Sequence, residues 1–340
     1  MKKHLNTLYI TKEDAWLSLD GETVAVSLYG ERLLRIPLVN LEAIQTFGWN
    51  IGASPALMAA CAEKGIHIAF CNPRGRLLCN VSGFTHGNVL LRRHQYRMAD
   101  NLQESLFVAK EMIAAKILNS RTVLQRIARD HSELAPVLGS VIKDLAVSTR
   151  CARRASSHAE LLGVEGHAAE RYFSVFSHLI IPSEFTFESR NRRPPTDPVN
   201  SLLSFVYSLL SNDCKSALEA VGLDSAVGLL HKERPGRPGL ALDLMEEVRA
   251  PMADRLVLAL LNRRQLKHTD FHMENSVGVR LSDNARKVVL TAWQERKAEM
   301  ILHPFLKEKI TMGMLLHIQA RLLAQHIRGA LNAYPPMIWK

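Results

Sequence analysis

The sequence lacks the features that would place this protein in a membrane or outside the cell. No apolar run approaches the roughly 18 residues that a membrane-spanning helix needs, and the acidic pair Glu13-Asp14 follows an N-terminus with no apolar core of a secretory signal. The five cysteines are an odd number, and no two are spaced as Cys-x-x-Cys, which disfavours a disulfide framework and a zinc site made of thiolates. We therefore expect a cytoplasmic protein that does not contact a membrane.

Two common catalytic signatures are also missing. The chain has no Gly-x-x-x-x-Gly-Lys-Ser/Thr loop, which argues against nucleotide hydrolysis by that route. It has no Gly-x-Ser-x-Gly nucleophile elbow either. With 340 residues, of which 47% are apolar, the chain is long enough to form two domains with separate cores.

Strand-like and helical patterns divide the chain into two parts. Over the first 84 residues short apolar segments alternate with turn residues, and Asp20-Gly21 predicts a hairpin. Within this part, Ser54-Pro55 is typical of a helix start. Further along, helical periodicity predominates. We predict an α+β protein with an N-terminal β-rich domain (1–82), a linker (83–88) and a larger all-α C-terminal domain (89–340).

The positive charge is concentrated in the second part. Residues 1–84 hold 8 Lys and Arg against 7 Asp and Glu, whereas residues 85–340 hold 35 against 26. Such an excess favours a polyanionic partner for the second part, although a charge that only serves solubility explains the high pI equally well.

Five arginines in the second part are candidates to contact phosphates, because a guanidinium offers planar donors to phosphate oxygens. Three lie in the proline-rich stretch 189–198, for which a solvated loop is the alternative interpretation. Two follow the histidine discussed below. The five are Arg190, Arg192, Arg193, Arg234 and Arg237.

A small acidic cluster stands out within this basic part. Asp243 and Glu246 are three residues apart and would share one face of a helix, where they could bind one cation. Glu247, four residues after Asp243, could do the same, and periodicity does not choose between the two glutamates. Because the surrounding region is basic and apolar runs flank the segment, a bound cation is a plausible counter-charge. A solvated acidic face is the alternative.

Glu165 and His231 could complete a metal site. Glu165 lies between two glycines, which leave room for a substrate. His231 precedes a Gly-Arg-Pro-Gly turn that brings it within reach of residues 240–249. Carboxylates with one imidazole are the ligands of a divalent metal that acts on phosphate oxygens. His268 and His272 are a competing pair at helical spacing, but they lack the glutamate of the metalloprotease motif.

Taken together, these segments resemble the CRISPR-associated integrase, the catalytic subunit of the spacer-acquisition complex. The resemblance extends over essentially the whole chain. Four segments carry it, at residues 162–166, 191–205, 231–237 and 240–249. The C-terminal residues 334–339 are similar to those of type I systems, subtype C among them.

The resemblance implies an N-terminal β-domain joined to an α-helical C-terminal domain, and it implies roles for five residues. It places Asp243 as an acid that assists the site and Tyr207 as a residue that contacts the substrate. Of the two neighbouring glutamates, the resemblance implies that Glu246 and not Glu247 is the metal ligand. The implied metal ligands are Glu165, His231 and Glu246.

The implied activity is that of a DNA integrase and endonuclease dependent on Mn²⁺ or Mg²⁺. A 3′-hydroxyl of a short duplex attacks a phosphodiester at a repeat boundary, and branched DNA is cut. The implied partners are double-stranded and branched DNA, a second copy of the chain, and a small ferredoxin-fold subunit, with residues 1–82 serving dimerisation and partner contacts. The alternatives are a catalytically degenerate nucleic-acid-binding scaffold of the same complex and a nuclease directed at RNA.

Overall fold

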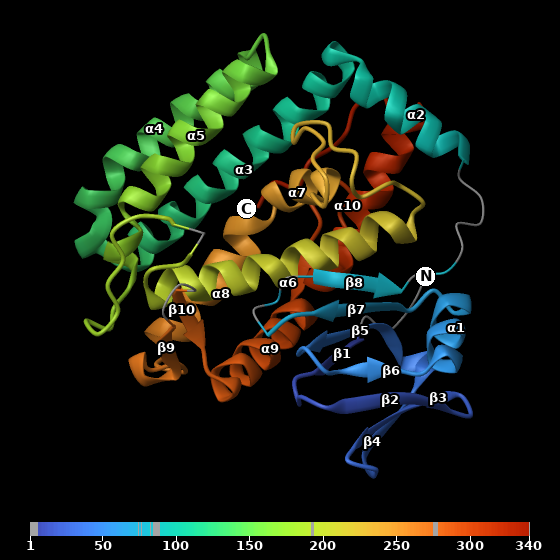
Figure 1. Ribbon diagram of the computed structural model, residues 1–340. Coiled ribbons are helices and arrows are strands. Elements are labelled where there is room, and N and C mark those ends of the chain that lie inside the picture. The colour runs from blue at the N-terminus through green and yellow to red at the C-terminus, as the bar shows by residue number, and fades with distance from the viewer. Residues whose placement is uncertain are drawn as a thin grey trace. The chain divides into compact units, whose positions relative to one another are not determined.

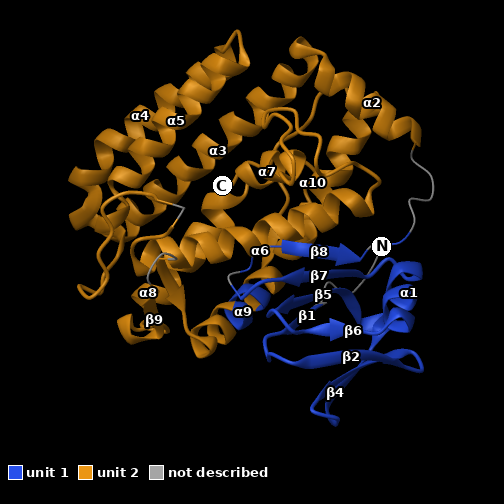
Figure 2. Ribbon diagram, in the orientation of Figure 1, with its two compact units in different colours: residues 1–87, 290–294 blue, residues 88–289, 295–340 orange. Residues whose placement is uncertain are grey.

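The computed structural model describes residues 6–73, 75, 77–81, 83, 89–191, 194–274 and 278–339. It divides into two compact units (Figure 2). Unit 1 comprises Met1–Gly87 with Leu290–Gln294, and unit 2 comprises Asn88–Val289 with Glu295–Lys340. Of the linker expected over residues 83–88, only Gly83 lies within the described residues.

Unit 1 contains two four-stranded sheets in its described part. The order of the first is β4-β3-β2-β6, from β2 (Ala15–Asp20), β3 (Thr23–Leu28), β4 (Glu31–Pro37) and β6 (Gly52–Ala53). The order of the second is β1-β5-β7-β8, from β1 (Asn6–Ile10), β5 (Leu41–Phe47), β7 (His67–Cys71) and β8 (Leu77–Val81). The predicted hairpin is confirmed, since β2 and β3 pair antiparallel across Asp20-Gly21 and Gly21 has a φ of 59°.

Helix α1 (Pro55–Glu63) lies in unit 1, and its predicted start is confirmed. The Ser54 hydroxyl accepts a hydrogen bond from the backbone N–H of Leu57 at 3.3 Å, as a helix N-cap does. Leu57 is fully buried, in one apolar cluster with Ile44 of β5 and Ile68 of β7. The core of unit 1 is therefore formed by strands and α1 together.

Unit 2 is built mainly of helices. Helices α3, α5 and α6 begin at side-chain caps, because Asn101, Ser157 and Asp197 each accept a backbone N–H of the first turn. Figure 1 shows α4 and α5 side by side along α3. The helices are α2 (Val89–Asp100), α3 (Leu102–Asp130), α4 (Ala135–Arg154), α5 (His158–Ser174), α6 (Pro198–Ala220), α7 (Gly239–Glu246), α8 (Arg255–Asn262), α9 (Asp283–Ala298), partly in unit 1, and α10 (Met312–Ile327).

The α+β class is confirmed, but the expectation of an all-α second domain is wrong. Unit 2 also contains the antiparallel pairs β9 (Phe271–Glu274) with β10 (Gly278–Leu281) and β11 (Met300–Leu302) with β12 (Lys309–Thr311). Strands of three or four residues are too short for a period of two to stand out in the sequence. His272 lies in β9, so the helical spacing that would pair it with His268 is absent.

Within the part of the chain that the structure describes, no helix has the length and apolar character needed to cross a membrane. The five cysteines all lie within the described residues, and none of them is in a disulfide. Cys61, Cys71 and Cys214 are buried, where a thiol packs as a small apolar group.

Candidate metal and catalytic centre

The carboxylates of Glu165 and Glu246 meet at one lysine. Glu165 lies on α5, Glu246 ends α7, and Lys116 lies on the buried middle of α3. The Lys116 ammonium forms an ion pair with Glu165 Oε1 and lies 2.7 Å from Glu246 Oε2. Three helices thus bring two of the predicted ligands to a single positive charge.

Glu246 stays ionised although its side chain is only 4% exposed. Burial alone would raise the pKa of Glu246, but Arg249 and then Lys116 lower it to about 2. Arg249 donates to Glu246 Oε1 at 2.7 Å. The Lys116 ammonium lies 2.7 Å from Oε2, so both oxygens of this buried carboxylate face a positive charge.

Asp243 holds His231 and the loop that carries it. The Asp243 carboxylate accepts the backbone N–H groups of Leu229 (2.6 Å), Leu230 (2.9 Å) and His231 (3.0 Å). Its Oδ1 also lies 2.6 Å from His231 Nδ1. In a neutral ring with Nδ1 as the donor, Nε2 carries no proton and can serve as a metal ligand. Asp243 is fully buried by these contacts, which makes it a residue that orients His231.

Two glycines allow this loop to pack against the start of α7. A Cβ on Gly228 would lie 2.6 Å from the carbonyl oxygen of His231 and 2.9 Å from Asp243 Oδ2. A Cβ on Gly239 would lie 2.6 Å from the carbonyl oxygen of Ala226. Any larger residue would push the loop from α7, so glycine is what brings His231 to Asp243.

The neighbouring Glu247 has different surroundings. Its Oε1 accepts the Tyr334 hydroxyl at 2.5 Å, and its Oε2 accepts Gln319 Nε2 at 2.9 Å and the backbone N–H of Met337 at 2.7 Å. Burial raises the pKa of Glu247 to about 7 against the lowering effect of these three donors. Both of its oxygens are therefore used by uncharged groups inside the protein.

Tyr207 is linked to Glu246 through an arginine. Its hydroxyl donates to Asp254 Oδ1 at 2.6 Å, and burial raises the pKa of Tyr207 well above its usual value. The guanidinium carbon of Arg249 lies 5.0 Å from the centre of the Tyr207 ring. The ring therefore supports the arginine that bonds Glu246, while contact of Tyr207 with a substrate stays a prediction.

The structure describes three of the five arginines predicted to contact DNA. Arg190 is engaged within unit 2, where its guanidinium donates to two side chains of α6 at 2.8 and 3.1 Å. Arg234 is exposed and Arg237 partly exposed, on the segment between His231 and α7. Arg192 and Arg193 lie outside the described residues.

The donor chemistry of Glu165, His231 and Glu246 fits a divalent metal, although their side chains are not gathered into a ligand set. Within the described residues, no three His, Cys, Asp or Glu side chains are grouped so as to hold an ion. The two carboxylates nevertheless converge on the Lys116 ammonium, so the space between them accepts positive charge. Two oxygen ligands and one nitrogen ligand suit Mn²⁺ or Mg²⁺.

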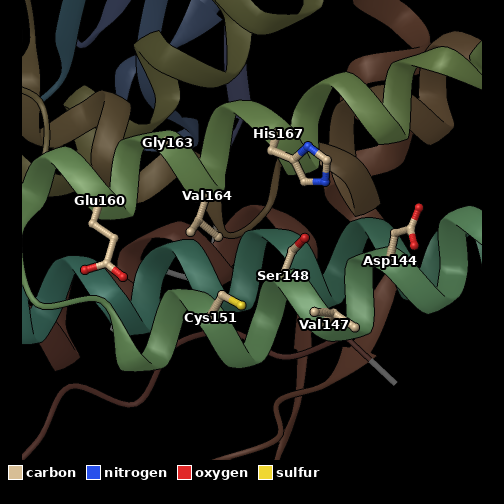
Figure 3. A pocket seen from close by; sticks show the side chains of 8 residues that line it. All are labelled: Asp144, Val147, Ser148, Cys151, Glu160, Gly163, Val164 and His167. Atoms are coloured by element: carbon tan, nitrogen blue, oxygen red, sulfur yellow. The ribbon is translucent and has the colours of Figure 1, made fainter.

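A separate cavity of about 510 Å³ lies between α4 and α5 (Figure 3). Its lining consists of Asp144, Val147, Ser148 and Cys151 of α4 and Glu160, Gly163, Val164 and His167 of α5. Glu165 is not part of this lining and contacts Lys116 of α3 instead. The cavity therefore contains none of the predicted ligands.

Reasoning from the sequence missed Lys116, Arg249 and Asp254. Lys116 interrupts the apolar run at residues 112–118, which is a signal that a buried charge needs a partner. Arg249 follows Glu246 by three residues, the spacing of a helical ion pair. Asp254 shows no such signal, because its partner Tyr207 lies on another helix.

The chain is similar in sequence to known proteins of one family. The family model "CRISPR associated protein Cas1" matches residues 8–295. A relative from Chlorobaculum tepidum, CRISPR-associated endonuclease Cas1 1, is 47% identical over 346 residues, which cover 100% of both chains.

Two solved structures have a similar fold. A casposase bound to integration product has a TM-score of 0.85 at 22% identity, over 96% of this chain and 92% of its own. A chain of a Cas6-RT-Cas1–Cas2 complex has a TM-score of 0.84 at 24% identity, over 100% of this chain and 36% of its own. At these identities the likeness concerns the fold alone.

Proposed function

The chain belongs to the Cas1 family of CRISPR-associated proteins, and we propose that it inserts short DNA duplexes into a CRISPR repeat array with the help of a divalent metal. It is an endonuclease and integrase of that family. The observation that carries the metal-dependent chemistry is the convergence of two carboxylates from separate helices, one of them buried and held ionised by neighbouring cations.

Three residues of this chain would hold the metal, namely Glu165, His231 and Glu246. When bound, a divalent metal stabilises the negative charge that builds on a phosphate as a 3′-oxygen bonds to phosphorus and the bond to the leaving oxygen breaks. Arg249 and Lys116 keep Glu246 anionic, and Asp243 orients His231 so that Nε2 is available. The nitrogen ligand favours Mn²⁺ over Mg²⁺.

Double-stranded and branched DNA are the proposed substrates. The basic excess of residues 85–340 supports this, and it makes affinity fall as the salt concentration rises. Arg234 and Arg237 lie close in sequence to His231 and are proposed to meet phosphates beside the metal. A type I system, subtype C among them, is proposed from the C-terminal residues 334–339, and a cytoplasmic location from the free cysteines.

Unit 1 is proposed to serve dimerisation and partner contacts. It exposes large apolar side chains, among them Trp16, Leu33 and Trp49, which are 49%, 45% and 64% exposed. A small ferredoxin-fold subunit is the proposed partner, and a chain of similar fold in a complex named for Cas2 supports it.

An integration assay tests the proposal. A labelled short duplex and a repeat-bearing target are incubated with the full chain, with and without Mn²⁺ and the partner subunit. The parent is expected to join the duplex to the target only with Mn²⁺, whereas Glu165→Gln and His231→Ala lose joining but keep their fold and dimer.

Glu170→Gln is the matched control, because Glu170 is exposed on the same helix as Glu165. Joining by Glu165→Gln and His231→Ala at the rate of this control would overturn the metal assignment. A parent that binds DNA without any Mn²⁺-dependent joining would instead support the scaffold alternative.

A further inference from the structure

The C-terminal tail, Tyr334–Trp339, folds back onto the end of α7. Figure 1 shows the C-terminus beside this helix. Tyr334 and Met337 are both 2% exposed, so the tail is packed into unit 2. Its contact point is Glu247, whose two oxygens accept the Tyr334 hydroxyl and the backbone N–H of Met337. The tail is thus bonded to the residue next to a proposed metal ligand.

Pro251 leaves the backbone carbonyl of Glu247 without its usual helical hydrogen bond. Pro251 lies in the π-helical turn Arg249–Asp254 and has no N–H, so it cannot bond the carbonyl of Glu247 four residues earlier. Asn119 of α3 takes that place, since its Nδ2 donates to the carbonyl of Glu247 at 2.6 Å. The end of α7 is therefore open to a partner from another helix.

The same asparagine also binds the tail. Its Nδ2 donates to the carbonyl of Met337 at 2.8 Å, and its Oδ1 accepts the backbone N–H of Trp339 at 2.7 Å. Asn119 is 1% exposed and satisfies backbone groups of both segments. Leaving such buried groups unpaired is unfavourable, so the tail and Glu247 hold each other in place.

Glu247 and Glu246 are consecutive residues, but their side chains have different kinds of partner. Uncharged groups contact Glu247, whereas cations contact Glu246. The tail and Gln319 hold Glu247 on one side, while Lys116 and Arg249 contact Glu246. Because Glu246 is the last residue of α7 and Glu247 is its C-cap, a shift of the backbone at Glu247 reaches Glu246 directly.

We propose that the tail is a positioning element for the metal site, in which Tyr334 and Glu247 set the placement of Glu246 and hence the affinity for Mn²⁺. The inference rests on the proposed function, in which Glu246 is a ligand. Residues that orient a ligand typically change metal affinity by about 10–100-fold when they are replaced. Tyr334 and Glu247 act through Glu246 and touch neither substrate nor metal.

Mn²⁺ binding to the full chain tests the proposal, measured by the electron paramagnetic resonance signal of free Mn²⁺. Tyr334→Phe keeps the ring and removes the hydroxyl, which donates to Glu247 and accepts Gln319 Nε2, and we expect about tenfold weaker binding. The Mn²⁺ concentration for half-maximal DNA cleavage should rise by the same factor, with the parent rate regained at high Mn²⁺. A merely structural bond would not produce this rescue.

Tyr96→Phe is the control, because the Tyr96 hydroxyl donates to Asp224 at 2.8 Å, another tyrosine–carboxylate bond in unit 2. It should bind Mn²⁺ as the parent does. Gln319→Met is a second test variant, since at similar volume it removes the amide that donates to the other oxygen of Glu247 and to Tyr334 and Pro335 of the tail. It keeps the proposal testable if Tyr334→Phe fails to fold.

The outcomes separate the inference from the proposed function. If Mn²⁺ binding by the parent is absent or insensitive to Glu246→Gln, the proposed function fails. If Glu246→Gln loses binding while the folded Tyr334→Phe and Gln319→Met variants bind as tightly as the parent, only the positioning role of the tail is overturned. Weaker binding by both variants, with rescue of cleavage at high Mn²⁺, supports it.

Discussion

Glu246 and Glu247 are neighbours in the sequence and equally deep in unit 2, but the regions around them differ in charge. Burial raises the pKa of both, yet Arg249 and Lys116 bring that of Glu246 down to about 2, while uncharged donors leave that of Glu247 at about 7. Burial therefore does not decide whether a carboxylate is available as a ligand. Here the charge of its neighbours does, because two cations stabilise the anionic form of Glu246 more than three uncharged donors stabilise that of Glu247.

Replacing each glutamate by glutamine is the strongest test of this difference. Glu246→Gln removes a proposed ligand charge, and we expect Mn²⁺-dependent cleavage of branched DNA to fall on the order of a thousandfold, or ~4 kcal/mol in the barrier. Glu247→Gln should need more Mn²⁺ but approach the parent rate when Mn²⁺ is high. The measurement is the cleavage rate across a Mn²⁺ titration. An equal loss of rate in both variants would contradict the view that Glu246 is a metal ligand and Glu247 is not.

Lys116→Met should have the next largest effect, on stability. It breaks a largely buried ion pair with Glu165 and Glu246, and we expect the free energy of unfolding in EDTA to fall by about 3 kcal/mol. Mn²⁺ should restore part of the loss, because it supplies the missing positive charge. Urea unfolding with EDTA and with Mn²⁺ measures both values.

Lys215→Met is the control for that substitution. Lys215 pairs with Glu219 at 3.9 Å, and both side chains are partly exposed, so its loss should cost less than about 1 kcal/mol. If Mn²⁺ restores no stability to Lys116→Met, or restores it equally to the control, the space between Glu165 and Glu246 does not bind the metal.

Asp254 should give the smallest effect, a pH dependence of stability. Burial raises the pKa of Asp254 from 3.8 to about 6, despite the hydrogen bond from Tyr207. Between these two values the folded protein holds a proton that the unfolded chain has lost, so the parent loses stability as the pH rises through this window. Asp254→Asn has no proton to lose at this position, so it lacks this pH dependence.

Urea unfolding from pH 4 to pH 7 measures the contribution of Asp254. The free energy of unfolding of the parent minus that of Asp254→Asn is expected to fall with rising pH and to level off above about 6. A difference that stays constant over the window would show that Asp254 is ionised throughout, as Glu246 is.

Local signals made part of the fold predictable. Asp20-Gly21 and Ser54-Pro55 determine a turn and a helix start from adjacent residues, and both are confirmed. The hairpins β9–β10 and β11–β12 were missed because three or four residues carry too little pattern.

The candidate site was likewise predictable from the sequence only in part. The sequence by itself determined the donor types, the basic region around them and the helical spacing of Asp243 with either glutamate, since these depend on composition and period alone. The sequence could not show that Lys116 approaches Glu165 and Glu246, or that the C-terminal tail forms hydrogen bonds with Glu247. These contacts join residues up to 130 positions apart, so only tertiary packing decided which glutamate is ionised and which is held by hydrogen bonds.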